Sequence, residues 1–179
     1  MFKAGRYFMI ARSIKKLPIF IKYFHTWLFV KCPNPKENWY SYRNLLTEAL
    51  KEKKPRSIIE WGTGRSTMLM RKLCPDAEIR SIESDFKWYL RWKLGIFGAH
   101  LYYIPVNRGY TSPNFPEKHF DFAFVDGELR VDCMRTALKL LKDDGLLMLH
   151  DSNSKELQPG IKMFKIVKEK NYTVLLKKK

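Results

Sequence analysis

The stretch IIEWGTGRST, residues 58–67, places two glycines directly behind an apolar run that contains Glu60. A short apolar run followed by glycine is typical of a buried strand that ends in a tight turn. Gly62 and Gly64 have no Cβ, so a ligand can approach the backbone there closely. The hydroxyl of Ser66 and the free N–H groups of a following helix suit a carboxylate or a phosphate. The stretch therefore predicts a strand, a ligand-binding turn and a helix.

The same alternation of strand and helix patterns continues along the chain. Strands are predicted at 57–61, 78–82, 101–106, 120–125, 146–150 and 172–176, and helices at 39–50, 66–73, 86–94, 131–141 and 160–169. This order predicts an α/β fold with a mostly parallel sheet of about six strands, helices on both faces, and further helices before it. A single strand is expected after the last helix.

The 179-residue chain is long enough for one domain with a core. Its charge, however, is distributed unevenly along the sequence. The net charge of +16 is uneven: residues 1–56 carry 13 Lys and Arg against 3 acids, residues 57–150 carry 13 against 12, and residues 151–179 carry 8 against 3. Because the excess lies in the flanks, it indicates docking more than chemistry. We expect basic-aromatic helices and a linker over 1–55, and the α/β domain over 56–179.

Residues 1–31 contain seven Lys or Arg, eight aromatic residues and no acid. No uncharged run approaches the roughly 20 residues that span a bilayer, and no small-residue cleavage site marks a signal peptide. Two interpretations stay open: a basic-aromatic helix pair that lies on an anionic membrane face, or helices that cover the core. Three separated cysteines without a Cys-x-x-Cys pair favour reduced thiols. The expected location is therefore the cytoplasm, with peripheral membrane contact under the first interpretation.

Glu83 stands at the tip of the second predicted strand, 23 residues after Glu60. A carboxylate at this place can accept hydrogen bonds from both hydroxyls of a ribose. The spacing also fits dinucleotide-binding enzymes, but their fingerprint has a third Gly or Ala where this chain has Thr67. The pattern therefore indicates a nucleoside-containing ligand and counts against NAD.

Four ordered motifs, EWGTGRST, SIESD, FVDG and GLLMLHDS, resemble those of class I S-adenosylmethionine (SAM)-dependent methyltransferases. More narrowly, the chain is similar to the small-molecule and sugar O-methyltransferases related to the macrocin and catechol enzymes. The resemblance covers residues 56–152 and implies a Rossmann-like, doubly wound fold with SAM as the cofactor. The implied cofactor-binding residues are Glu60, Gly62, Gly64 and Ser66 at the methionine end, Glu83 at the ribose, and Asp126. Asn107 is a further candidate for the adenine, or else a turn residue.

Asp126 and Asp151 end two strands that this fold places side by side. In the metal-dependent relatives, two Asp and one Asn at such places hold Mg²⁺, which orients a substrate hydroxyl and lowers its pKa. The resemblance therefore implies Asp126 and Asp151 as catalytic residues and metal ligands. This chain departs from the pattern, because Ser152 follows Asp151 and Asn153 comes only one residue later.

His150 is the candidate general base, since imidazole exchanges protons near neutral pH. Strand side chains alternate between faces, so His150 has a second interpretation as a residue of the buried face. Leu129 stands where the relatives often carry Lys or His. Beside it, Arg130 is a candidate for binding an anionic substrate group, or a solvated residue at a helix start.

The resemblance implies that a methyl group passes from SAM to an oxygen of a sugar, a glycan or another small polar acceptor. Three alternatives remain open. An NAD-linked oxidoreductase would use the same strand tips. A nucleic-acid methyltransferase would use the basic surface to bind RNA or DNA. A non-catalytic binding module would be held at a membrane by its basic flanks.

Overall fold

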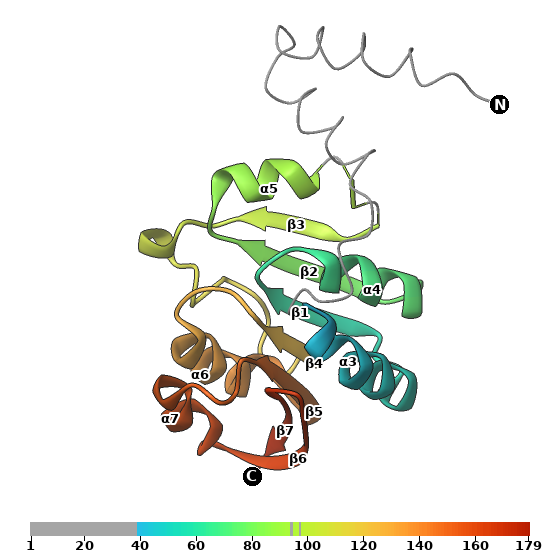
Figure 1. Ribbon diagram of the computed structural model, residues 1–179. Coiled ribbons are helices and arrows are strands. Elements are labelled where there is room, and N and C mark those ends of the chain that lie inside the picture. The colour runs from blue at the N-terminus through green and yellow to red at the C-terminus, as the bar shows by residue number, and fades with distance from the viewer. Residues whose placement is uncertain (1–38, 94, 97) are drawn as a thin grey trace, which may run out of the picture.

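A seven-stranded sheet forms the centre of the described part of the protein (Figure 1). The computed structural model describes residues 39–93, 95–96 and 98–179. The strands are β1 (Ser57–Trp61), β2 (Glu78–Glu83), β3 (His100–Tyr103), β4 (Phe120–Val125), β5 (Leu141–His150), β6 (Phe164–Lys170) and β7 (Thr173–Lys178). Their spatial order is β3-β2-β1-β4-β5-β7-β6. The first five are parallel, and β7 runs antiparallel to both β5 and β6, so the expected mostly parallel sheet is confirmed.

Helices cover both faces of the sheet, because alternate residues of its central strands point in opposite directions. The helices are α3 (Trp39–Lys53), α4 (Arg65–Leu73), α5 (Phe86–Lys93), α6 (Arg130–Leu140) and α7 (Gln158–Ile161). On one face, Phe122 and Phe124 of β4 belong to a core shared with α3 and α4. On the other face, Ala123 and Val125 belong to a core shared with α6 and α7. These two cores give the sheet a three-layer arrangement.

The strand order reverses between β1 and β4, because the chain moves from β1 outward to β3 and then returns to the other side of β1. Open α/β sheets bind ligands beyond the carboxyl ends of the strands at such a point. The hydrogen-bonding register brings Ile82, Trp61, Val125 and Leu149 to one level across β2, β1, β4 and β5. The next residue of each strand or turn, namely Glu83, Gly62, Asp126 and His150, therefore lies at the same edge of the sheet.

The C-terminal hairpin corrects two expectations. The helix expected over 160–169 is wrong, since α7 ends at Ile161 and the segment from Phe164 forms β6. Two strands therefore follow the last helix where one was expected, and the sheet has seven strands where about six were expected. Asn171 and Tyr172 form a two-residue turn between β6 and β7, both with positive φ, of 49° and 59°. Such a turn matches the twist of a hairpin, so pairing with β7 overrides the local helical pattern.

Helix α3 belongs to the same core as the sheet, although it lies before the predicted α/β domain. Leu45, Leu46 and Leu50 are fully buried or nearly so, in one cluster with Ile58 of β1. The basic-aromatic segment 1–31 lies outside the described residues, so its two interpretations stay predictions, as does the boundary between 1–55 and 56–179. Within the described part of the chain, no helix is long and apolar enough to cross a membrane.

Candidate functional site

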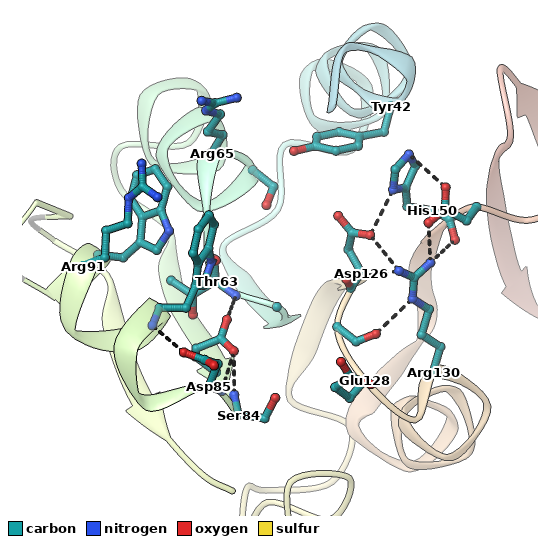
Figure 2. Close-up of a pocket in the computed structure, with 18 residues that line it drawn as sticks. Tyr42, Thr63, Arg65, Ser84, Asp85, Arg91, Asp126, Glu128, Arg130 and His150 are labelled. Carbon is teal, nitrogen blue, oxygen red and sulfur yellow. Dashed lines mark hydrogen bonds and ion pairs between the residues drawn. The ribbon is translucent and has the colours of Figure 1, made fainter. Parts of the chain in front are cut away.

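A cavity of about 640 Å³ opens where β1, β2, β4 and β5 end (Figure 2). Its volume lies within the range of about 300–1,000 Å³ that is common for small-molecule sites. The turns after β1 and β2 form one wall, the residues that follow β4 and β5 form the other, and Tyr42 of α3 reaches between them. Seven of the predicted site residues line the cavity, namely Gly62, Gly64, Ser66, Glu83, Asp126, His150 and Asp151.

The two glycines of the first turn differ in what surrounds them. Gly62 has a φ of 99°, and a Cβ added to it would lie 2.9 Å from the backbone nitrogen of Gly127. Gly62 therefore allows the end of β1 to lie against the turn that follows β4. A Cβ added to Gly64 would meet no protein atom within 4 Å. The space beside Gly64 is thus open to the cavity, and a ligand can occupy it.

Glu60 lies behind the cavity wall and is fully buried. Its carboxylate accepts hydrogen bonds from the hydroxyls of Ser66 and Ser81, both at 2.5 Å, and from the hydroxyl of Thr67. Burial raises the pKa of Glu60 to about 7, against the opposing effect of these hydrogen bonds. Thr67 in turn accepts a hydrogen bond from the N–H of Gly64 at 2.9 Å. Glu60 thus fixes the turn and the start of α4, and Ser66 is the member of this network that faces the cavity.

Glu83 is held at the end of β2 by three backbone donors. Its Oε2 accepts the N–H of Thr63 at 3.1 Å, and its Oε1 accepts those of Ser84 and Asp85 at 2.7 and 2.8 Å. Burial raises the pKa of Glu83 above its ordinary value, and the three backbone bonds oppose that rise. Since each carboxylate oxygen has two lone pairs, Glu83 keeps acceptor capacity toward the cavity.

Trp88 and Arg91 of α5 also line the cavity, although sequence reasoning did not select them. The Trp88 side chain donates from Nε1 to the carbonyl oxygen of Thr63 at 2.6 Å, and Trp88 is 40% exposed. The Arg91 guanidinium carbon lies 4.9 Å from the centre of the Trp88 ring system. The sequence feature that could have indicated them is the aromatic run that begins three residues after Glu83. Asn107, by contrast, is exposed in a 3-10 helix and is not part of the cavity wall.

His150 forms the centre of the other wall and is 6% exposed. Its Nδ1 lies 2.9 Å from Asp126 Oδ1, and its Nε2 lies 2.8 Å from the hydroxyl of Ser41. A carboxylate only accepts hydrogen bonds, so Nδ1 carries a proton, and with the proton there Nε2 can accept from Ser41. Asp151 Oδ1 lies 3.6 Å from the same Nε2 atom. The ring of Tyr42 packs edge-on against the imidazole, with centroids 5.0 Å apart. His150 therefore lies on the α3 face of the sheet and still lines the cavity.

Arg130 forms ion pairs with both predicted metal ligands, and Figure 2 shows it beside Asp126 and His150. Its Nη1 donates to Asp151 Oδ2 and to the carbonyl oxygen of His150, both at 2.9 Å. Its Nη2 lies 3.3 Å from Asp126 Oδ1 and donates to the carbonyl oxygen of the same residue at 3.4 Å. Its Nε donates to the carbonyl oxygen of Gly127 at 3.0 Å. Arg130 is thus a fixed part of the site and not a solvated residue of a helix start.

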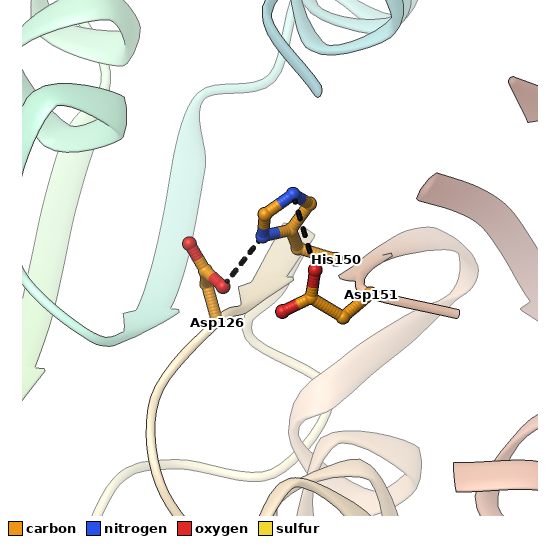
Figure 3. A group of neighbouring side chains, drawn as sticks. All are labelled: Asp126, His150 and Asp151. Carbon is orange, nitrogen blue, oxygen red and sulfur yellow. Dashed lines mark hydrogen bonds and ion pairs between the residues drawn. The ribbon is translucent and has the colours of Figure 1, made fainter. Parts of the chain in front are cut away.

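Asp126, His150 and Asp151 offer three atoms that lie within 4.8 Å of one another (Figure 3). Mg²⁺ prefers about six oxygen ligands in octahedral geometry. Here one of the three ligands is a nitrogen, each carboxylate already binds the Arg130 guanidinium, and Asp126 Oδ1 also binds His150. Asn153, the amide nearest in sequence to the relatives' third ligand, is exposed and is not part of the cavity wall. The residues as arranged do not fit Mg²⁺.

No family model and no curated protein matches the sequence, but solved structures match the fold over most of the chain. PaMTH1 from Podospora anserina, a methyltransferase with S-adenosylhomocysteine (SAH) bound, is 14% identical with a TM-score of 0.60, over 100% of this chain and 97% of that one. TomG from Streptomyces achromogenes, an O-methyltransferase in complex with SAM, is 18% identical with a TM-score of 0.52, over 85% and 75%. A methyltransferase from Geobacter sulfurreducens is 14% identical with a TM-score of 0.56, over 94% and 95%.

This chain shares its fold with these solved methyltransferases. The resemblance of the four motifs to class I methyltransferases is thereby confirmed at the level of the fold, together with the doubly wound sheet. Each of the four motifs includes the end of a strand, in the order β1, β2, β4 and β5, and the turn that follows it. All four therefore border the cavity at the reversal of strand order.

Proposed function

We propose that the protein is a SAM-dependent methyltransferase that acts on an oxygen of a small polar acceptor, such as a sugar hydroxyl. The observation that carries this proposal is the cavity between Gly64 and His150, with open space beside the glycine and a backbone-held carboxylate at Glu83. PaMTH1 and TomG, which share the fold, bind SAH and SAM respectively, and this supports the same cofactor here.

The cofactor would lie along the wall formed by the turns after β1 and β2. Its methionine end would pass Gly64 and Ser66, where space is open and a helix N-terminus favours a carboxylate. Its ribose would bind Glu83, because Oε2 of this carboxylate keeps a lone pair for a ribose hydroxyl. The exposed ring of Trp88 next to Glu83 suits contact with the adenine. This arrangement would direct the sulfonium methyl group toward the opposite wall.

SAM, when bound, supplies a methyl group that is already activated for in-line displacement, so the protein contributes mainly position and proton transfer. We assign His150 as the general base for the acceptor hydroxyl. Asp126 holds the proton on Nδ1, so the lone pair of Nε2 faces away from it. The acceptor hydroxyl would replace Ser41 as the partner of Nε2 and pass its proton there as the new carbon–oxygen bond forms.

We further propose that residues 1–31 bring the protein to an anionic membrane surface. The support is compositional: seven cations, eight aromatic residues and no acid precede a nearly neutral core. Aromatic groups at a headgroup boundary and cations at lipid phosphates would hold the protein reversibly without crossing the bilayer. Such a place would suit an acceptor that is part of a lipid-linked glycan.

Calorimetric titration of the full-length protein with SAM, SAH and NAD tests the proposed cofactor. We expect SAM and SAH to bind and NAD not to bind. Gly64→Val should remove SAM binding, because its side chain would enter the open space, while Asn107→Ala, outside the cavity wall, serves as the matched control and should bind normally. Binding of NAD alone, or unchanged SAM affinity in Gly64→Val, would contradict the proposal.

A further inference from the structure

We propose that Arg130 occupies the position of a divalent cation between Asp126 and Asp151, so that the site works without a metal ion. The proposal rests on the proposed methyl transfer for its catalytic meaning. Its structural content, an internal cation that closes a metal site, rests only on the contacts among these side chains.

The first support is the geometry of the guanidinium. Arginine has five N–H donors in a fixed planar arrangement. Four of them are hydrogen-bonded here: Nε donates to one carbonyl oxygen, Nη1 donates to a carbonyl oxygen and to Asp151 Oδ2, and Nη2 donates to a carbonyl oxygen. Nη2 also forms an ion pair with Asp126 Oδ1 at 3.3 Å. Three backbone carbonyls therefore orient the guanidinium independently of the two carboxylates. The cation is thus held between both acids by the backbone of the turns after β4 and β5.

The second support is that the start of a helix disfavours a cation at this position. Arg130 is the first residue of α6, where the positive end of the helix dipole disfavours a positive side chain. The side chain is only 20% exposed, so it is also partly removed from water. The three backbone carbonyls offset part of the loss of water, but only the two carboxylates, at 2.9 and 3.3 Å, compensate the positive charge. The position of Arg130 is therefore explained by the charge of the acid pair.

The chemical consequence concerns the acceptor. A bound metal ion has open coordination positions and can hold a substrate hydroxyl directly. Arg130 offers no comparable open position, since four of its five N–H groups are hydrogen-bonded within the protein and the fifth is on Nη2, which lies 3.3 Å from Asp126 Oδ1. Arg130 is then a positioning residue: it holds the Asp126 carboxylate, which in turn holds Nδ1 of His150. Acceptors that depend on chelation by a metal should be excluded.

The test is Mn²⁺ binding, followed by electron paramagnetic resonance on the full-length protein. The wild type should bind no Mn²⁺ at this site. Arg130→Ala leaves three ligand atoms within 4.8 Å of one another, and it should gain one Mn²⁺ site. The double variant Arg130→Ala/Asp126→Asn is the control and should lose that site again. If Arg130→Ala does not fold, Arg130→Gln is used, and its thermal unfolding midpoint should rise with Mn²⁺ while that of the wild type does not.

Two results would overturn the proposal. One is a Mn²⁺ site in the wild type that Asp126→Asn removes, because Arg130 would then move aside for a metal. The other is a folded Arg130 variant that gains no Mn²⁺ site, because the acid pair would then not be a cation position. SAM titration of the same wild-type sample separates the two proposals. A protein that binds neither SAM nor Mn²⁺ contradicts the proposed function alone, and one that binds both contradicts the role of Arg130 alone.

Discussion

Gly62 and Gly127 lie back to back where β1 and β4 end. A Cβ on Gly62 would come within 2.9 Å of the Gly127 nitrogen, and a Cβ on Gly127 would come within 3.1 Å of the Gly62 nitrogen. The N–H of Asp126 also donates to the carbonyl oxygen of Trp61 at 2.9 Å, so the two turns are joined by their backbones. This close approach sets Asp126 beside the cofactor wall, and it makes the first glycine of the motif a structural residue.

Gly62→Ala should therefore mainly lower stability, whereas Gly64→Ala should mainly weaken SAM binding. Gly62→Ala should lower the free energy of unfolding by about 1–3 kcal/mol, because it forces a non-glycine residue to positive φ against the Gly127 backbone. Gly64→Ala should change the free energy of unfolding by less than about 1 kcal/mol, because nothing lies near the new Cβ, and it should weaken SAM binding. Urea unfolding and calorimetry measure the two effects. Equal losses of stability in the two variants would contradict this division of roles.

Glu60→Gln should remove a pH dependence of stability. The pKa of Glu60 is about 7 in the folded protein against an ordinary 4.5, so the folded state binds this proton more tightly than the unfolded state. The stabilising contribution is complete below pH 4.5 and is lost as the pH rises to about 7. It amounts to about 3 kcal/mol. Urea unfolding of both proteins across this range should show the wild type losing stability relative to Glu60→Gln, whereas a constant difference would refute the assignment.

Glu83→Ala should weaken SAM binding by about 1–3 kcal/mol, because the ribose hydroxyls lose a charged acceptor in a buried setting. Glu83→Gln should bind with intermediate affinity, since its amide keeps one acceptor oxygen. The control is Glu117→Ala, which removes an exposed carboxylate outside the cavity wall. Calorimetry that finds wild-type affinity in both Glu83 variants would place the ribose elsewhere.

His150→Gln should lower methyl transfer by about 10²–10⁴-fold, the usual contribution of a general base. SAM affinity should stay near that of the wild type, because His150 lies on the wall opposite the proposed cofactor position. Ser41→Ala is the matched control: it removes a partner of the same Nε2 atom but no proposed catalytic group. SAH release in the presence of polar hydroxyl acceptors measures the rate. A fully active His150→Gln would require another base.

Deletion of residues 1–31 should abolish binding to anionic liposomes in co-sedimentation. The full-length protein should bind only when anionic lipid is present and should dissociate at high salt, since each cation near such a surface contributes about 1 kcal/mol. Adding RNA or DNA as a competitor tests whether the same segment binds nucleic acid instead of lipid. If the truncated protein unfolds and the full-length protein does not bind anionic liposomes, the segment covers the core instead.

Much of the fold could be predicted from local sequence patterns. The short apolar runs of the central strands and the glycines at 62 and 64 predicted β1, β4 and the turn between β1 and α4, because apolar runs and glycine turns are signals carried by residues close in sequence. The same local reasoning failed at Phe164–Lys170, which forms strand β6. Six of its seven residues are exposed, so no buried stripe marked it as a strand, and its conformation depends on pairing with β7.

By itself, the sequence determined which residue types end the strands: Glu83, Gly62, Asp126 and His150 each stand at a predicted strand end. Only the tertiary structure decided that the sheet register brings these four to one level. It alone also decided that Glu60 lies behind the wall and that Arg130 lies between two carboxylates. The physical reason is that side-chain direction and charge pairing depend on contacts between residues far apart in the chain, which a local pattern does not specify.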